Sequence, residues 1–206
     1  MEIAIEQKVK NIPSFELSYE TSLPHRKVYQ EEEGRGGVGA PSAPPEQLGL
    51  FIPKSKKYLV WFTFVEDQDV AILIELGRDK KPQQCKIMKG LVFDPNGPEL
   101  AQGTILYGSL FYKTENMVYF IIEDLILHRS ILMRKLCFGD KLAILERIFE
   151  KREITREFSG PEDGIQYAFT FPICFNGTHR EPTAEEMAQV PYPIHHVQYR
   201  LFDRIV

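Results

Sequence analysis

The sequence predicts an α+β fold built from mainly antiparallel β-sheets with one or two helices. Short hydrophobic segments recur along the chain, and Asp, Gly, Pro or Asn residues bound them, as is typical of strands. They follow one another closely, which favours antiparallel pairing of neighbours. Residues 138–152 instead show a helical repeat of apolar side chains. A chain of 206 residues with 43% hydrophobic content can bury one core, so we expect a single domain over 1–206.

The clearest strand signal is a hairpin at residues 103–126, where two hydrophobic strands flank a turn at 113–116. Residues 69–76 are almost continuously apolar, which favours a place inside the sheet rather than at its edge. A polar loop at 66–69 connects this segment to the preceding strand. The expected strands span residues 15–20, 56–65, 69–76, 85–93, 103–112, 117–126, 165–173 and 195–202.

Two segments carry helix signals. In residues 138–152 four apolar side chains share one helical face, and Asp140 can cap the first turn. A shorter helix is expected at 183–189, where Thr183 and Glu186 have the spacing of a capping box. The apolar face of the longer helix consists of Leu142, Leu145, Ile148 and Phe149.

Residues 31–49 combine an acidic run with glycines and prolines, and this composition predicts a long exposed loop. Gly34, Gly36 and Gly39 fit the spacing of a dinucleotide-binding loop. Glutamates precede them and prolines follow, whereas that motif needs a strand before it and a helix after it. The loop is therefore expected to contact a partner protein rather than a dinucleotide.

Net charge, cysteine content and the lack of targeting signals exclude several classes of protein. A net charge of -4 and a pI near 5.8 give no overall positive field for nucleic acid, so any such contact must be local. The three cysteines are scattered, which indicates a reducing compartment. Residues 1–13 lack the apolar stretch of a secretory signal, and no run approaches the roughly 18 residues of a membrane span. We expect a protein that is not secreted and has no membrane span.

Candidate binding residues are basic rather than metal-ligating. His195 and His196 are neighbours in an expected strand, so their side chains should point to opposite faces, and no metal site is predicted. Basic residues flank two neighbouring strands and can form a patch for phosphate or an acidic partner. Protection of a sheet edge by lysine explains them equally well. The patch consists of Lys54, Lys56, Lys57, Arg78, Lys80 and Lys81.

Residues 50–172 resemble the nucleotidyltransferase domain of mRNA capping enzymes and nucleic-acid ligases. The resemblance covers Lys54 in "FIPKSKKYLVWFTF", Gly108 in "TILYGSLF", Asp124 in "YFIIEDLI" and Asp163 in "EDGIQY". It implies that Lys54 forms a covalent lysyl-nucleotide with GTP or ATP. It also implies that Asp124 or Asp163 positions Mg²⁺ or the ribose.

The sequence departs from the family at the reactive positions. The Lys-x-Asp-Gly motif reads "KSKK" from Lys54, and the Asp-Gly-Glu motif reads "YGS" from Tyr107. Glu123 stands where the family has a base-stacking aromatic residue, and the closing lysine pair is absent. Loss of these groups removes the stabilisers of metal and phosphate charge. We therefore expect a degenerate domain that has no cofactor.

The order of segments such as "FELSYE", "GTILYG" and "PYPI" also resembles proteins of large eukaryotic double-stranded DNA viruses. This resemblance implies a non-catalytic structural protein, such as a minor capsid component, in the virion or host cytoplasm, with other viral proteins as partners. The first alternative is a guanylyltransferase-like or ligase-like enzyme that uses Mg²⁺ with GTP or ATP. The second is a non-catalytic nucleotide-binding or RNA-binding subunit of the viral transcription or capping machinery.

Overall fold

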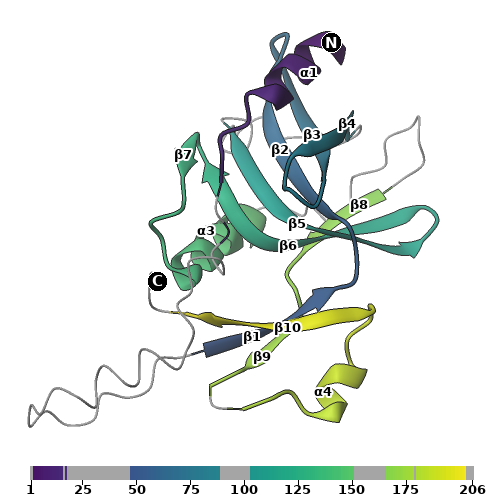
Figure 1. Cartoon of the computed structure of the whole chain (residues 1–206), viewed down its shortest axis with the longest axis vertical. Coiled ribbons are helices and arrows are strands. Elements are labelled where there is room, and N and C mark those ends of the chain that lie inside the picture. The colour runs from purple at the N-terminus through teal and green to yellow at the C-terminus, as the bar shows by residue number, and fades with distance from the viewer. Residues whose placement is uncertain are drawn as a thin grey trace, which may run out of the picture.

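A computed structural model describes residues 2–15, 17, 47–88, 103–150, 166–178 and 180–202 (Figure 1). Its larger sheet has seven strands in the order β4-β3-β2-β5-β6-β7, with β8 parallel to β6 and the other pairs antiparallel. The strands are β2 (Lys57–Val65), β3 (Gln68–Leu76), β4 (Pro82–Ile87), β5 (Thr104–Thr114), β6 (Met117–His128), β7 (Ile131–Leu132) and β8 (Gln166–Thr170).

A second sheet of three antiparallel strands lies below the larger one in Figure 1. Its central strand β1 (Gln47–Pro53) pairs with β10 (Ile194–Leu201) on one side and with β9 (Cys174–Asn176) on the other. The ring of Phe175 packs directly against Gly49, where an added Cβ would lie 2.3 Å from the ring atom Cζ. A glycine is therefore required at the centre of β1.

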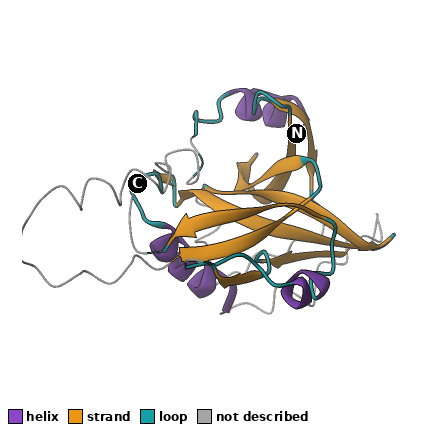
Figure 2. Cartoon of the chain, turned by 60° about the horizontal axis from the view of Figure 1, so that its bottom comes forward, coloured by secondary structure: helices purple, strands orange, loops and turns teal. Residues whose placement is uncertain are grey.

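The described residues contain three helices beside the sheets: α1 (Glu2–Lys10), α3 (Phe138–Glu150) and α4 (Ala184–Ala188). Figure 2 shows α1 and α3 on opposite sides of the strands. Along β2, Val60 and Phe62 join the hydrophobic cluster beneath α3, whereas Leu59 and Trp61 join the cluster beneath α1. This alternation follows from the two-residue period of a strand, and it makes the larger sheet buried on both faces.

The α+β class with mainly antiparallel sheets is confirmed, as are the hairpin at 103–126, the helix at 138–150 and the helix at 184–188. The capping box is also present, because Thr183 Oγ1 accepts from the Glu186 N–H at 3.2 Å and Glu186 Oε2 accepts from the Thr183 N–H at 2.9 Å. Residues 69–76 belong to an internal strand, as expected.

Several expected boundaries were wrong. Residues 47–49 belong to β1 rather than to the loop at 31–49, because their backbone completes the small sheet. The strand expected from residue 85 begins at Pro82. Asp140 lies inside the first turn of α3, and the sulfur of Cys137 caps the helix by accepting from the Asp140 N–H at 3.4 Å.

Other expectations fall wholly or partly outside the described residues. These are residues 31–46 of the loop, most of the strand expected at 15–20, and the end of the strand expected at 85–93. Phe15 and Leu17 are described, and neither lies in a strand. The helix α1 was not expected, since the apolar side chains described as buried in it, Ile5 and Val9, form too short a repeat to be recognised.

Candidate functional site at the junction of the two sheets

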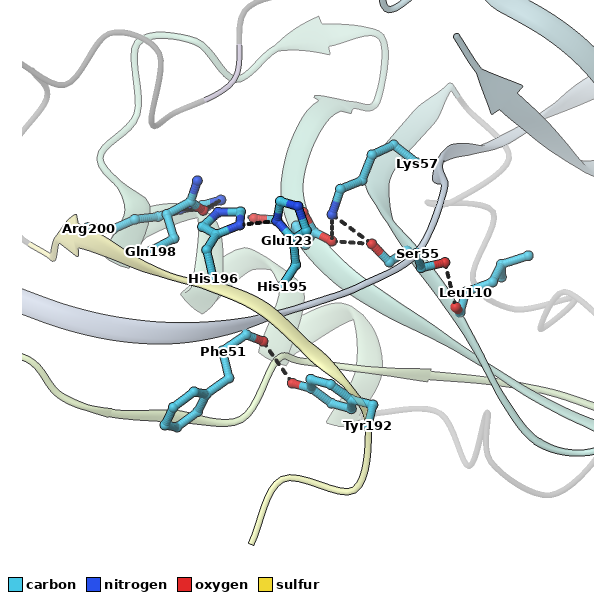
Figure 3. Close-up of polar contacts among 11 residues, drawn as sticks. Phe51, Ser55, Lys57, Leu110, Glu123, Tyr192, His195, His196, Gln198 and Arg200 are labelled. Atoms are coloured by element: carbon cyan, nitrogen blue, oxygen red, sulfur yellow. Dashed lines mark hydrogen bonds and ion pairs between the residues drawn. The ribbon is translucent and has the colours of Figure 1, made fainter. Parts of the chain in front are cut away.

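Lys57, Ser109 and Glu123 form a polar cluster where the two sheets meet, and Figure 3 shows the side chains of Lys57 and Glu123 pointing toward each other. Lys57 begins β2 and lies opposite Ser109 of β5 in the strand register. Lys57 Nζ lies 2.6 Å from Glu123 Oε1 and 2.8 Å from Ser109 Oγ. The Ser109 hydroxyl also donates to Glu123 Oε1. The cluster thus joins three neighbouring strands through one carboxylate.

A β-bulge in β6 determines which way the side chain of Glu123 points. Tyr107 pairs with Asp124 and Gly108 pairs with Ile122, so Glu123 is the extra residue between them. The bulge brings the main chain of β6 close to β5, since a Cβ on Gly108 would lie 2.0 Å from the carbonyl oxygen of Ile121. The glycine shared with the family motif therefore has a packing role in this chain.

Asp124 and Lys141 form a second, more deeply buried pair. Lys141 Nζ of α3 lies 2.9 Å from Asp124 Oδ1, and the two side chains are 3% and 0% exposed. Asp124 Oδ1 also accepts from the Leu125 N–H at 2.9 Å. The carboxylate that the sequence suggested for metal or ribose is thus bound to a lysine and to the backbone.

Arg200 connects the small sheet to this cluster. Its Nη1 donates to the carbonyl oxygen of Glu123 at 2.6 Å, while Nε and Nη2 donate to Gln198 Oε1 at 2.9 and 2.6 Å. The guanidinium lies over the ring of Phe138, 4.4 Å from its centroid. Because Phe138 begins α3, one side chain contacts the small sheet, the bulge of β6 and the helix.

The prediction that His195 and His196 point to opposite faces was wrong. Their Nδ1 atoms lie 2.6 Å apart, and Figure 3 shows the two rings side by side. The register explains this arrangement, because Ile52 pairs with His196 and Pro53 pairs with Ile194, which leaves His195 as the extra residue of a bulge. A bulge breaks the alternation of side chains that a regular strand imposes.

Burial lowers the pKa of His196 below its ordinary value of 6.5, and the positive charges of His195 and Lys57 lower the pKa further, against the opposing effect of Glu123. The folded protein therefore binds this proton less readily than the unfolded chain. Protonation of His196 therefore destabilises the folded protein. Its stability is unaffected by this group above about pH 6.5 and decreases as the pH falls below that value.

We therefore expect the free energy of unfolding to fall on acidification from about pH 7 to pH 5, measured by urea unfolding at each pH. In His196→Gln this dependence should become shallower, because glutamine does not titrate. An identical pH dependence in the variant would show that another group is responsible.

Of the residues predicted from the family motifs, the structure describes Lys54 and Asp124, and the lysine that binds Asp124 is Lys141. Lys54 is exposed at the turn between β1 and β2, where its backbone N–H donates to the Pro193 carbonyl oxygen at 2.8 Å. Asp163 lies outside the described residues. The lysine that reaches β5 and β6 is instead Lys57, three residues later. No group of three or more potential metal ligands occurs in the part of the chain that the structure describes.

Half of the residues of the predicted basic patch form ion pairs with carboxylates in the described part of the chain. Lys56 Nζ lies 2.6 Å from Glu75 Oε1, and Lys81 Nζ lies 3.5 Å from Asp79 Oδ2. Lys57 binds Glu123 as described above. Arg78 is exposed, and Lys80 lies in the same turn as Lys81 with a φ of 61°. Much of the positive charge therefore serves contacts within the chain.

No model of a known protein family matches the sequence, and a search of curated proteins finds no match. The nucleotidyltransferase relationship therefore stays a prediction. None of the helices in the described ranges has the length and apolar composition needed to cross a bilayer.

Proposed function

We propose that this chain is a non-catalytic structural or interaction protein. The observation that carries the proposal is that both carboxylates at the sheet junction are bound by lysines of the same chain, Glu123 by Lys57 and Asp124 by Lys141. A buried carboxylate that is paired in this way would be left as an uncompensated charge if its lysine were removed, and it has little capacity left for a metal ion.

Accessibility supports the same conclusion. Nucleotidyl transfer requires a lysine amine next to a bound α-phosphate, with carboxylates to hold the metal. Ser109 is 0% exposed, and Glu123 and Asp124 are 2% and 1% exposed, so a nucleotide has no direct route to them. Lys54 is accessible, but no carboxylate of the described residues forms an ion pair with it.

We further propose that the protein is a virion component, such as a minor capsid protein, of a large double-stranded DNA virus, with other viral proteins as partners. The support for this assignment is the resemblance of the segments "FELSYE", "GTILYG" and "PYPI". The function would then lie in surface contacts, and the buried charges would hold the two sheets in a fixed arrangement for those contacts.

The decisive assay for enzymatic activity is covalent labelling. The protein is incubated with α-³²P-labelled GTP or ATP and Mg²⁺, denatured and separated by electrophoresis, with an active capping enzyme as the positive control. We expect no label on the wild-type chain. Label that disappears in Lys54→Ala or Lys57→Ala but persists in the control Lys113→Ala, an exposed lysine in β5, would establish nucleotidyl transfer and end the proposal.

A further inference from the structure

A groove of about 980 Å³ lies between α1, the segment that follows it, and the connection from β3 into β4. Phe15 and Leu59 contribute to its apolar lining. Its size is at the upper end of the range of ordinary ligand pockets, about 300–1,000 Å³, and its walls come from three separate segments. Three lysines also line the groove: Lys10, Lys80 and Lys81.

The charge of the groove is positive on balance. Its acidic side chains are Glu6 and Asp79, and the carboxylate of Asp79 is already 3.5 Å from Lys81 Nζ. The exposed Arg78 precedes this pair in the same turn. An occupant that fits should therefore offer carboxylates around an apolar side chain.

The helix α4 offers this combination of side chains. It contains no buried residue, and Met187 is 43% exposed. Glu181 and Glu185 are also exposed on either side of the helix start. The segment from Arg180 to Val190 therefore presents an apolar side chain among carboxylates, and we call it the α4 knob.

Polar contacts order the helical part of the α4 knob, while its ends, Arg180 and Val190, pack against the small sheet. The capping box closes its first turn, and the guanidinium of Arg180 binds the carboxylate of Glu186 through two contacts of 2.7 and 2.9 Å. These contacts lower the pKa of Glu186 to about 2, so the carboxylate stays charged. A knob that is ordered before it binds loses little conformational entropy on docking.

We propose that the α4 knob of one copy docks into the groove beside α1 of a second copy of this chain. A helical turn of five residues occupies about 700 Å³ at a diameter of 10–12 Å, which the groove can hold. Met187 would enter the apolar floor, where its flexible side chain adapts to an irregular surface. Glu181 and Glu185 would then lie near the lysines of the groove.

The contact is head-to-tail because α1 and α4 lie at opposite ends of the long axis of the molecule (Figure 1). Such a heterologous contact leaves one free knob and one free groove in every pair, so it extends into a ring or a filament. A single-turn knob buries less than roughly 1,200 Å², which is the size range of weak encounters. Each contact is therefore weak. The inference rests on the proposed function, since repeated self-association is a property of an assembly protein.

The test is a charge exchange measured by sedimentation velocity at low salt. The knob variant is Glu181→Lys/Glu185→Lys, and the groove variant is Lys10→Glu/Lys81→Glu. The wild type should form larger species as its concentration rises. For each variant alone, the self-association constant should be at least about tenfold lower than for the wild type, because like charges then face each other. An equimolar mixture of the two should recover the association of the wild type, because every knob then finds a groove of opposite charge.

The control variant Glu115→Lys/Glu146→Lys changes the net charge as the knob variant does, but at exposed sites outside both surfaces. It should associate like the wild type. A monomeric wild type, or a mixture of folded variants that stays monomeric, would overturn the inference. Neither result bears on nucleotide labelling, so failure of this contact and failure of the proposed function are separate outcomes.

Discussion

Replacing Lys141 with methionine is expected to lower the free energy of unfolding by about 3–5 kcal/mol, the usual cost of breaking a buried ion pair by removing one partner. Asp124 is 1% exposed, and Lys141 Nζ is the cation that lies 2.9 Å from its carboxylate. Methionine keeps most of the volume of the lysine, so the loss reports the missing cation rather than a cavity. Urea unfolding followed by circular dichroism measures it.

The matched control is the double variant Asp124→Asn/Lys141→Met. The asparagine oxygen can still accept the hydrogen bond from the Leu125 N–H, and no charge is left unpaired. The double variant should therefore recover more than half of the stability that Lys141→Met loses. A single variant within about 0.5 kcal/mol of the wild type, the range of ordinary surface substitutions, would show that the pair contributes nothing.

The second large effect is expected for Lys57→Met. This variant should lower the free energy of unfolding by about 2–4 kcal/mol, because the Glu123 carboxylate loses its cation. Glu123 is 2% exposed, whereas the side chain of Lys57 is 28% exposed. Water can reach the vacated position more easily than it can at Lys141, so the loss is smaller. Ser109 still donates to the carboxylate in the variant and limits the loss further.

Lys56 is the matched control for Lys57. It carries the same side chain one residue earlier and lies 2.6 Å from Glu75, but its side chain is 68% exposed. Exposed pairs of this kind contribute about 0–1 kcal/mol, so Lys56→Met should leave the stability almost unchanged. If Lys56→Met and Lys57→Met lowered the free energy of unfolding equally, the burial of Glu123 would not explain the effect of Lys57→Met.

The sequence was sufficient to predict much of the fold because hydrophobic periodicity and turn residues are local signals. The strands at 57–65 and 68–76 and the hairpin around residue 115 are short apolar runs bounded by polar turns, which is such a local signal. The capping box of α4 was also local, since Thr183 and Glu186 lie three residues apart. The strand β1 was missed because the glycines and prolines before it dominate the composition of its neighbourhood.

The site could not be predicted in the same way, because bulges determine it. One extra residue in β6 points Glu123 at Lys57, and one extra residue in β10 brings His195 beside His196. Neither insertion leaves a local signal, since it depends on the length of the partner strand. The family resemblance implied Lys54, three residues before the lysine that the sheet brings to Ser109. The one usable clue was Glu123-Asp124, two adjacent carboxylates inside an otherwise apolar strand.

The most direct measurement is a double-mutant cycle of stability between Lys57 and Glu123, using Lys57→Met, Glu123→Gln and the double variant. If the junction charges serve the fold, each single variant is less stable than the wild type and the coupling energy is about 1–3 kcal/mol. Residues held in place for catalysis commonly reduce stability, so their replacement raises it. Single variants that are more stable than the wild type, with a coupling energy near zero, would contradict a structural role for the junction.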